Sequence, residues 1–269
     1  MNPDDLVLLA GRNSERVQAA SREVAGLKST RSRVEGRVLD VTDPIAISEL
    51  AQELEEQHGG VDVVLSNAFY RLVPDRPQSE QADEFIKVSN GATHAILRSF
   101  GPVMRDGGRL IVVASVLGRI GYLNPELRSL FDGATLDEVE KAVDTWRAAA
   151  SRGTAQQDGW PVWLKAPSKV AQVAAVRAVA AERREADLAN GTLVAAVCPG
   201  MVDTGYLPHW YGDRRQAQSP LEAAGPIVDL VLADTVNPDH YGELIQFGKA
   251  LSWHGGTQDS YEQEHMVTA

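Results

Sequence analysis

Residues Trp160 to Ala180 read WPVWLKAPSKVAQVAAVRAVA, a Trp-Pro corner followed by a run of alanine and valine that predicts a long helix. Two lysines, Lys165 and Lys169, stand four residues apart where this helix begins, a spacing that puts two side chains on one face of a continuous helix. Pro167 lies between them, and proline is tolerated only in the first turn of a helix. We therefore expect the regular helix to start near Ala166, with Lys165 just outside it. Whether the two lysines share a face is open at this point.

On both sides of this stretch, short apolar runs alternate with segments that carry apolar residues at helical spacing. Alternating strands and helices, without an internal repeat, predict an α/β fold with a Rossmann-like doubly wound parallel sheet that helices cover on both sides. The expected strands are residues 5–10, 34–39, 61–65, 109–114, 192–198 and 242–247. The expected helices are residues 14–26, 44–58, 79–105, 124–131, 136–152, 166–190 and 219–233.

The length of 269 residues fits one large domain, which we place at residues 1–251. Residues 116–159 separate a strand from its crossover helix by more than such connections usually span, so we interpret them as a helical insertion. Residues 252–269 are polar and are expected to form a loose C-terminal tail.

The composition excludes several kinds of partner and site. The formal net charge is -11 and the basic residues are scattered, which makes nucleic acid and anionic membranes poor partners but leaves room for a phosphate-bearing small molecule. A single cysteine, Cys198, excludes an internal disulfide framework, and the histidines lack metal-ligand spacing, so no metal site is predicted. Because no apolar run approaches about 20 residues and the start does not read as a signal peptide, we expect a cytoplasmic protein.

In a doubly wound sheet, ligands bind beyond the carboxyl ends of the strands. This rule makes the residues that follow the predicted strands candidates for a site. They are Arg12, Asp40, Asn67, Ser115, Pro199 and Gly200. Taken singly, each also has an ordinary interpretation, such as a surface arginine for Arg12, a strand-end hydroxyl for Ser115 or an amide bonded to nearby backbone for Asn67.

Several separate motifs occupy these positions. They are Asp40-Val41, Ser66-Asn67-Ala68-Phe69, Asn90 in the middle of a predicted helix, Ser115, Lys169, and PGMVDT at residues 199–204. Together they resemble the short-chain dehydrogenase/reductase family, and within it the monomeric carbonyl reductases, over nearly the whole chain. The resemblance implies NADP as the cofactor and a small-molecule ketone or aldehyde as the substrate. The insertion, which resembles the one that covers the subunit contact of tetrameric members, implies a monomer.

The resemblance also implies roles for individual residues. Ser115 would hydrogen-bond the carbonyl oxygen of the substrate, Lys169 would hold the nicotinamide ribose, and Asn90 would order a water relay. The remaining residues implied in cofactor binding are Arg12 at the 2'-phosphate, Asp40 and Val41 at the adenine, Asn67, and Pro199, Gly200 and Thr204 at the nicotinamide end.

The chain departs from the family first at its start. It begins at what resembles the second family strand, so the first strand and its Gly-rich turn, which place the pyrophosphate at a helix N-terminus, have no counterpart. The strands at residues 5–10 and 61–65 would then lack a shared neighbour. Either the sheet re-pairs or the chain is incomplete. We favour an incomplete chain, because residues 5–10 have the apolar character of an interior strand.

The second departure is Lys165, which stands where the family has the tyrosine that protonates the developing alkoxide. A lysine can act as this acid only if burial and the Lys169 cation lower its pKa well below the usual value of about 10.4. Otherwise Lys165 is a solvated lysine, and Tyr122, Tyr206 or Tyr211 could enter the site from a loop instead.

Three functions fit these observations. The first is an NADP-dependent reductase of ketones or aldehydes. The second is a non-redox catalyst, such as an isomerase, cyclase or dehydratase, that uses Ser115 and the two lysines in the same pocket. The third is a catalytically inactive binding protein. Binding of a nicotinamide cofactor, together with turnover of a ketone, distinguishes the first from the other two.

Overall fold

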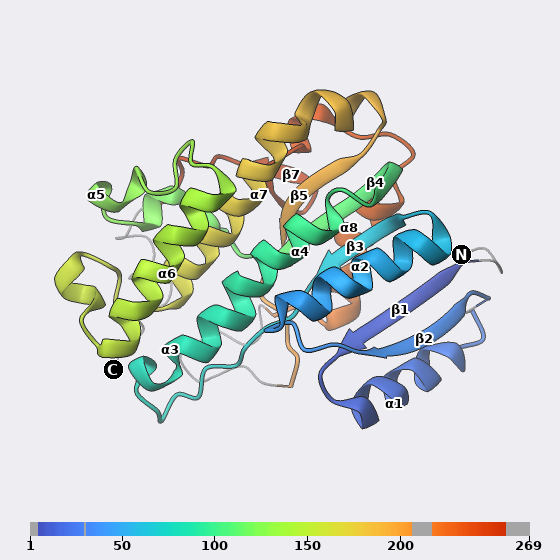
Figure 1. Cartoon of the computed structure of the whole chain (residues 1–269), viewed down its shortest axis with the longest axis horizontal. Coiled ribbons are helices and arrows are strands. Elements are labelled where there is room, and N and C mark those ends of the chain that lie inside the picture. Colours follow the sequence, from blue (N-terminus) through green and yellow to red (C-terminus); the bar gives the residue numbers. More distant parts are fainter. Residues whose placement is uncertain (1–4, 30, 206–216, 257–269) are drawn as a thin grey trace.

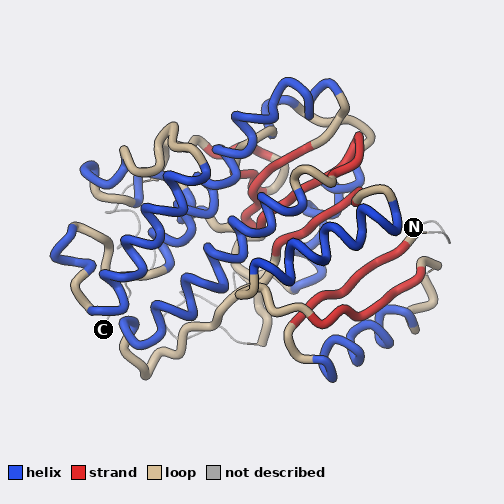
Figure 2. Tube along the Cα trace, viewed as in Figure 1, coloured by secondary structure: helices blue, strands red, loops and turns tan. Residues whose placement is uncertain are grey.

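The computed structural model describes residues 5–29, 31–205 and 217–256 (Figures 1 and 2). The strands are β1 (Leu6–Gly11), β2 (Arg33–Val38), β3 (Val61–Ser66), β4 (Met104–Val113), β5 (Leu193–Cys198), β6 (Leu244–Gln246) and β7 (Lys249–Leu251). The α-helices are α1 (Ser14–Ala25), α2 (Pro44–His58), α3 (Gln78–Ile86), α4 (Ala92–Phe100), α5 (Pro125–Arg128), α6 (Leu136–Arg152), α7 (Lys165–Ala189) and α8 (Pro220–Leu232). A π-helical turn (Lys87–Gly91) joins α3 to α4. The predicted alternation of strands and helices is confirmed.

The strands form a mainly parallel sheet in two parts. β3, β4, β5, β6 and β7 are hydrogen-bonded in that order, while β1 pairs with β2 in a separate two-stranded sheet. Every pairing is parallel except the one between β6 and β7. The carboxyl ends of the parallel strands therefore lie at one edge, where ligands bind in sheets of this kind and where the site is predicted.

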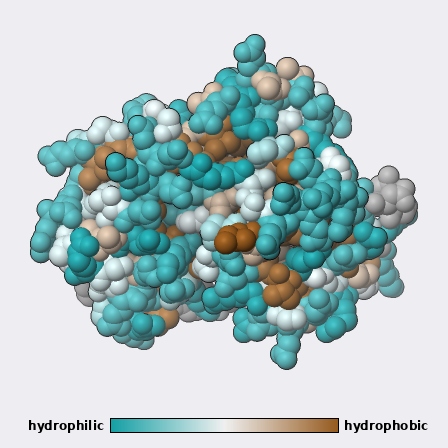
Figure 3. All heavy atoms as spheres, in the orientation of Figure 1, coloured by the Kyte–Doolittle hydropathy of each residue, from teal (hydrophilic) through white to brown (hydrophobic). Residues whose placement is uncertain are grey.

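The boundary between the two sheets leaves apolar side chains uncovered. Among the described residues, β1 pairs only with β2 and β3 pairs only with β4, so one edge of each strand has no partner. The sheet has therefore not re-paired around the missing strand. On β3, which lies at this boundary, Val63 and Leu65 are 44% and 47% exposed. The face of the molecule in Figure 3 is mainly hydrophilic and is interrupted by separate hydrophobic patches. As predicted, β1 and β3 have no common neighbour.

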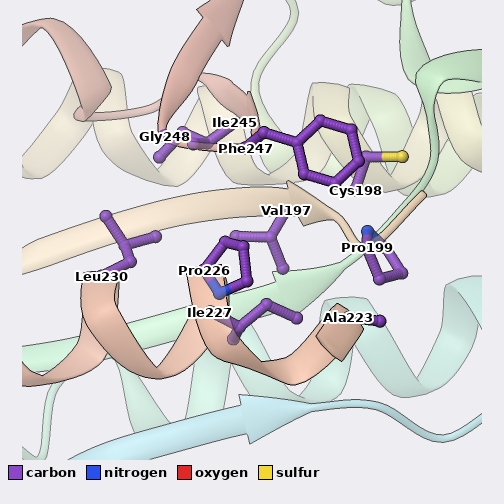
Figure 4. Close-up of a pocket in the computed structure, with 10 residues that line it drawn as sticks. All are labelled: Val197, Cys198, Pro199, Ala223, Pro226, Ile227, Leu230, Ile245, Phe247 and Gly248. Atoms are coloured by element: carbon purple, nitrogen blue, oxygen red, sulfur yellow. The ribbon is translucent and has the colours of Figure 1, made fainter. Parts of the chain in front are cut away.

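Helices lie on both faces of the five-stranded sheet. α2, α4 and α7 cross one face (Figure 1), and α8 lies on the other, where its Ala223 and Ile227 line a small apolar cavity with Val197 of β5 (Figure 4). α7 can approach the sheet closely because its inward residues, such as Val170 and Ala171, are small and fully buried. In the part of the chain that the structure describes, no helix is both long and apolar enough to cross a membrane.

Residues 116–159, interpreted above as an insertion, fold into α5, α6 and short 3₁₀ turns that pack on the core. Trp146 of α6 is almost fully buried, and its ring centroid lies 5.8 Å from that of Trp160, which in turn lies 6.2 Å from the ring of Phe131. The first residues of the expected loose tail are also packed. Trp253 is buried, and its Nε1 donates a hydrogen bond of 2.9 Å to Asp132.

The helix predicted over residues 79–105 is wrong in two respects. It is divided into α3, the π-helical turn and α4, and it already ends at Phe100. Gly101 and Pro102 follow, and proline cannot continue a helix because it has no N–H and its ring clashes with the preceding turn. β4 starts at Met104 as a consequence, five residues earlier than predicted.

Two smaller features also differ from the prediction. Asn13 caps α1 in place of Ser14, because its Oδ1 accepts a hydrogen bond of 2.9 Å from the backbone N of Arg16. β7 was not predicted. It pairs antiparallel with β6 after a tight turn in which Phe247 and Gly248 both have positive φ, and such a turn after a three-residue strand gives little sequence signal.

The closest approach of α7 to the loop after β4 can be tested at Gly118. A Cβ at this position would lie 2.5 Å from Cγ2 of Val173 and 3.0 Å from the backbone O of Lys169. We expect Gly118→Ala to lower the free energy of unfolding by about 1–3 kcal/mol, because the packed neighbours must shift to accept the methyl group. Urea unfolding monitored by circular dichroism measures this change.

The matched control is Gly225→Ala within α8, where an added Cβ meets nothing within 4 Å. Alanine is the better helix former, so this variant should be more stable than the parent by about 0.5–1 kcal/mol. A Gly118→Ala protein as stable as the Gly225→Ala protein would contradict the packing of α7 described above.

Candidate active site at the ends of β4 and β5

The start of α7 lies against the carboxyl ends of β4 and β5. Lys169 Nζ donates to the backbone O of Val113, the last residue of β4, at 3.5 Å. The Lys169 cation is also close enough to Cys198, the last residue of β5, to lower the pKa of its thiol, although burial is the larger effect and leaves that pKa raised. The structure therefore places Lys169 at the end of β4, whose last residue stands two residues before Ser115 in the chain.

Lys165 and Lys169 lie on one face of α7. The helix begins at Lys165, one residue earlier than predicted, and Pro167 is accommodated in its first turn. The two lysines are consequently four residues apart on a continuous helix, which answers the question that the sequence left open. α7 begins with no side-chain cap and no acidic residue in its first turn.

Burial lowers the pKa of both lysines to about 8. For Lys165, burial is the cause. For Lys169, burial is the largest effect, Cys198 acts in the opposite direction, and the positive charge of Lys165 lowers the pKa further. Both side chains remain partly exposed to solvent. The pKa shift of Lys165 is the one that the sequence analysis required before this lysine could serve as an acid.

A hydrogen-bonded group behind Lys169 was missed by sequence reasoning. Lys169 Nζ donates to Gln172 Oε1 at 2.7 Å, and the Gln172 amide is in turn fixed by its Nε2, which donates to the backbone O of Ser89 at 3.0 Å and to Thr93 Oγ1 at 2.9 Å. Thr93 Oγ1 donates to the same Ser89 oxygen. The sequence did carry one signal for the contact between Lys169 and Gln172. The two residues are three positions apart on the predicted helix, a spacing at which side chains are neighbours.

Asn90 lies at the π-helical turn and joins α4 to α7. The side chain is fully buried, its Nδ2 donates to the backbone O of Ser168 at 2.9 Å, and its Oδ1 accepts from Ser168 Oγ at 2.8 Å. Its hydrogen bonds to α7 therefore go to Ser168, the neighbour of Lys169 in the chain. The structure gives Asn90 a packing role, and the water relay stays a prediction.

The Ser115 hydroxyl already accepts one hydrogen bond within the protein. Its Oγ accepts a bond of 3.3 Å from the backbone N of Leu117 and so caps the 3₁₀ turn that follows β4. The hydroxyl hydrogen is not used by that bond, so the half-buried side chain can still donate to a ligand.

The candidates for adenosine binding lie at the ends of β1 and β2. Asp40 accepts from the backbone N and the Oγ1 of Thr42 at 2.9 and 2.8 Å, and these bonds, with a smaller effect of Arg12, lower the pKa of its carboxyl group. Arg12 is thus close to Asp40, and both are exposed, while Val41 is partly buried. Asn67, at the end of β3, is exposed and so is open to a ligand.

The candidates for the nicotinamide end follow β5. Pro199 and Gly200 are partly buried and Thr204 is exposed. On the α8 side, Pro199 and Cys198 line a cavity of about 10 Å³ together with the ring of Phe247 (Figure 4). That volume holds one water molecule at most, so this face of the strand end is a packed apolar contact, and a ligand must approach from elsewhere.

A larger cavity of about 390 Å³ lies at the opposite edge of the sheet, beside the start of β5. Its one buried charged side chain in the described part of the chain, Arg109, already donates to the backbone oxygens of Gly107, Gly108, Gly191 and Ala233. These bonds join β4 to the residues just before β5 and just after α8. The cavity is therefore separate from Ser115 and the lysines.

Of the three tyrosines considered as alternative acids, only Tyr122 lies within the described residues. Its ring is buried in a cluster with Leu117 and Ala166, and its hydroxyl accepts from Arg119 Nη2 at 2.8 Å. Tyr206 and Tyr211 lie outside the described residues. Among the described residues, Lys165 therefore stays the candidate for the acid. It stands where the resemblance implies a tyrosine, and its pKa is lowered.

The described residues can accept the two ends of NADP(H). Ser115, Lys169 and the segment after β5 are available to a nicotinamide ring, and Arg12 and Asp40 meet at the adenosine side. Between the nicotinamide and adenosine ends, however, the described chain has no strand that pairs with both β1 and β3. It also has no glycine-rich turn at a helix N-terminus that could bind the diphosphate. The fit is therefore incomplete at the phosphates.

Comparisons with known proteins agree with the fold described above. Residues 5–129 match the family model described as enoyl-(acyl carrier protein) reductase. The chain is 26% identical to carbonyl reductase (NADPH) 1 of Mus musculus over 253 residues, which cover 92% of this chain and 88% of the relative. Salutaridine reductase from Papaver somniferum matches with a TM-score of 0.72 at 21% identity, over 88% and 90% of the two chains. NADPH-bound carbonyl reductase from chicken fatty liver matches with a TM-score of 0.62 at 17% identity, over 94% and 89%.

The packing role of Asn90 predicts a stability change. Asn90→Ala removes the two buried hydrogen bonds between Asn90 and Ser168, so we expect the free energy of unfolding to fall by about 1–3 kcal/mol. The control is Asn67→Ala at the exposed end of β3, which should stay within about 0.5 kcal/mol of the parent. Urea unfolding of the three proteins measures both changes, and equal stability of all three would contradict the role assigned to Asn90.

Proposed function

We propose that this chain, a short-chain dehydrogenase/reductase protein that resembles the carbonyl reductases, acts on the carbonyl group of a ketone or an aldehyde. Its resemblance to carbonyl reductases supports NADP(H)-dependent reduction as the reaction by ancestry. The observation that carries the proposal is the pair of half-buried lysines on one face of α7, next to Ser115 at the end of β4.

In this proposal Lys165 is the proton donor. A pKa of about 8 leaves most of its side chain as ammonium at neutral pH, yet makes it a much stronger acid than a lysine in water at about 10.4. General acid catalysis is most effective when the pKa of the acid lies close to the working pH. Burial favours release of the proton, because desolvation makes the ammonium form of Lys165 less stable than its neutral form.

Ser115 orients the substrate. Its Oγ already accepts a bond from Leu117, so the hydroxyl hydrogen is directed to another acceptor, and the carbonyl oxygen of a substrate is suitable. Hydrogen bonding from Ser115 and the approach of the Lys165 ammonium both stabilise negative charge on that oxygen. A nicotinamide cofactor would supply the hydride to the carbonyl carbon.

The incomplete fit at the phosphates sets a condition on this proposal. Lys169, Pro199, Gly200 and Thr204 would hold the nicotinamide end. Backbone N–H groups of a glycine-rich turn at a helix N-terminus usually bind the diphosphate, and the described residues have no such turn between the ends of β1 and β3. We therefore expect NADP(H) to bind this chain more weakly than a complete phosphate site would bind it.

A second candidate function is non-redox catalysis on a carbonyl compound, such as isomerisation, cyclisation or dehydration. It is favoured by the two lysines of lowered pKa, which can hold and transfer protons without a cofactor. It would use Ser115 and the lysines at the same place. An inactive binding protein is the third possible outcome of the experiments below.

We further propose a monomer whose partner is a small molecule, with neither nucleic acid nor a membrane as a partner. The net charge of -11 opposes binding to polyanions. The insertion supports a monomer, because α6 packs against α3 and α7 of its own chain and so covers helix surface that a second chain would need. Light scattering of the purified protein measures the oligomeric state.

The reductase proposal is tested with NADPH. We expect an increase in NADPH fluorescence on binding and oxidation of NADPH when a ketone or aldehyde is added. Lys165→Tyr restores the family's acid and should raise the rate at least roughly tenfold, whereas Lys165→Met should lower it by about 100-fold or more. Lys141→Met, an exposed lysine of α6, is the control and should leave the rate unchanged. Absence of both binding and turnover with either nicotinamide cofactor would count against reduction and favour the other two functions.

The pH dependence identifies the acid separately. If Lys165 is the donor, the rate should fall as the pH rises through about 8, because the ammonium that gives the proton is lost. In Lys165→Tyr the fall should move towards about 10, the usual pKa of a phenol. Rates measured from pH 6 to 10.5 with both proteins provide the comparison, and an identical profile would rule out Lys165 as the donor.

A further inference from the structure

The amine of Lys169 has two neutral oxygens as its partners. Its Nζ donates to Gln172 Oε1 at 2.7 Å and, more weakly, to the backbone O of Val113 at 3.5 Å. Within the described residues, no carboxylate forms an ion pair with it. A neutral amine has two hydrogens and one lone pair, so two acceptors use both hydrogens and leave the lone pair directed away from them. The arrangement therefore suits an amine as well as it suits an ammonium.

The helix start adds to this preference. α7 begins at Lys165 with no acidic residue in its first turn, and the side chain that accepts a hydrogen bond of 2.9 Å from the backbone N of Leu164 at this start is the neutral Gln78. The partial positive charge of the helix N-terminus is therefore not compensated by an acidic residue of that turn. That charge disfavours further cations nearby. The two lysines are themselves close enough for the charge of Lys165 to lower the pKa of Lys169. Near pH 8 the pair consequently holds about one proton less than two ordinary lysines would hold.

We propose that Lys169 is an amine nucleophile that captures an aldehyde or ketone as an imine, with Lys165 as the proton donor and without a nicotinamide cofactor. This activity shares the carbonyl class of substrate with the proposed function but goes beyond reduction. A lysine that is desolvated next to another cation is an established way to activate this nucleophile in proteins.

The chemical steps balance without an oxidant or a reductant. The Lys169 lone pair attacks the carbonyl carbon, the N–C bond forms, and the carbonyl oxygen takes the proton of the Lys165 ammonium to give a carbinolamine. The oxygen then leaves as water with a second proton, which comes from the Lys169 nitrogen by way of Lys165. The iminium that remains carries one hydrogen on the Lys169 nitrogen, and this last proton passes to the neutral amine of Lys165 to give the imine. The net change is one amine and one carbonyl compound converted to one imine and one water, and Lys165 ends with the proton it began with.

Gln172 is the positioning residue in this proposal. Its amide is anchored by Ser89 and Thr93, so it holds the Lys169 nitrogen while adding no charge. A carboxylate at the same position would form a buried ion pair and keep Lys169 as an ammonium, which has no lone pair with which to attack. The neutral side chain at position 172 is therefore a condition for the reaction.

The experiment traps the imine on the full chain with no nicotinamide present. The protein is incubated at pH 7.5 with benzaldehyde and sodium cyanoborohydride, and the labelled lysines are found by peptide mass spectrometry. At this pH, a lysine of pKa about 8 has about 200-fold more neutral amine than a lysine in water. We expect Lys169 to be labelled at least tenfold faster than the exposed lysines Lys28, Lys141 and Lys249. Equal labelling of all lysines, or labelling of Lys165 in place of Lys169, would overturn the proposal.

Two further measurements test the role of the surroundings. The labelling rate of Lys169 should rise with pH and have its midpoint near 8, and a midpoint above about 10, the value of an ordinary lysine, would overturn the proposal. Gln172→Glu should slow labelling at pH 7.5 at least fivefold and approach the parent rate at pH 10.5. Gln157→Glu, an exposed position, is the matched control and should not change the rate. Circular dichroism confirms that each variant is folded. Because no nicotinamide is added, failure of the reductase experiments leaves this result unaffected.

Discussion

The burial of a positively charged helix start against the ends of β4 and β5 is the constraint on which the rest of this site depends. The Ala- and Val-rich face of α7 can lie close to the sheet, and Gly118 leaves room for it at its first turns. This close packing carries Lys165 and Lys169 partly out of water. Desolvation disfavours the charged form of a lysine, so the packing of the helix sets the proton affinity of the two side chains. A change in the packing of the core would therefore also change the pKa of the two lysines.

Much of the architecture could be predicted from the sequence. The apolar runs gave six of the seven strands, and the carboxyl-end rule selected Ser115, Pro199 and the end of β3 correctly as neighbours of one sheet edge. The starts of α2 and α6 were also recognisable. These features depend on local signals, such as the cap formed by Asp43 and the periodicity of buried residues, which the sequence carries in a few adjacent positions.

The features that sequence reasoning missed depend on contacts between distant segments. Gln172 is held in place by hydrogen bonds to Ser89 and Thr93, about eighty residues earlier in the chain. The burial of the two lysines likewise depends on how closely α7 approaches the sheet. The early end of α4 is different, because Gly101 and Pro102 are a local stop signal that the continuing amphipathic pattern obscured. The separation of β1 and β2 from β3 was predicted, because the sequence has no strand that could pair with both β1 and β3.

The π-helical turn at residues 87–91 has a consequence for the spacing of the chain. Such a turn contains one more residue than an α-helical turn, so α3 and α4 are out of phase with each other across it. Deleting a single residue there would restore one continuous helix and rotate α3 by about 100° relative to α4. Phe85 and Gln81, both buried, would then turn away from the core while Asn90 lost its position opposite Ser168. The structure of this region therefore depends on the length of the segment as well as on the identity of its residues.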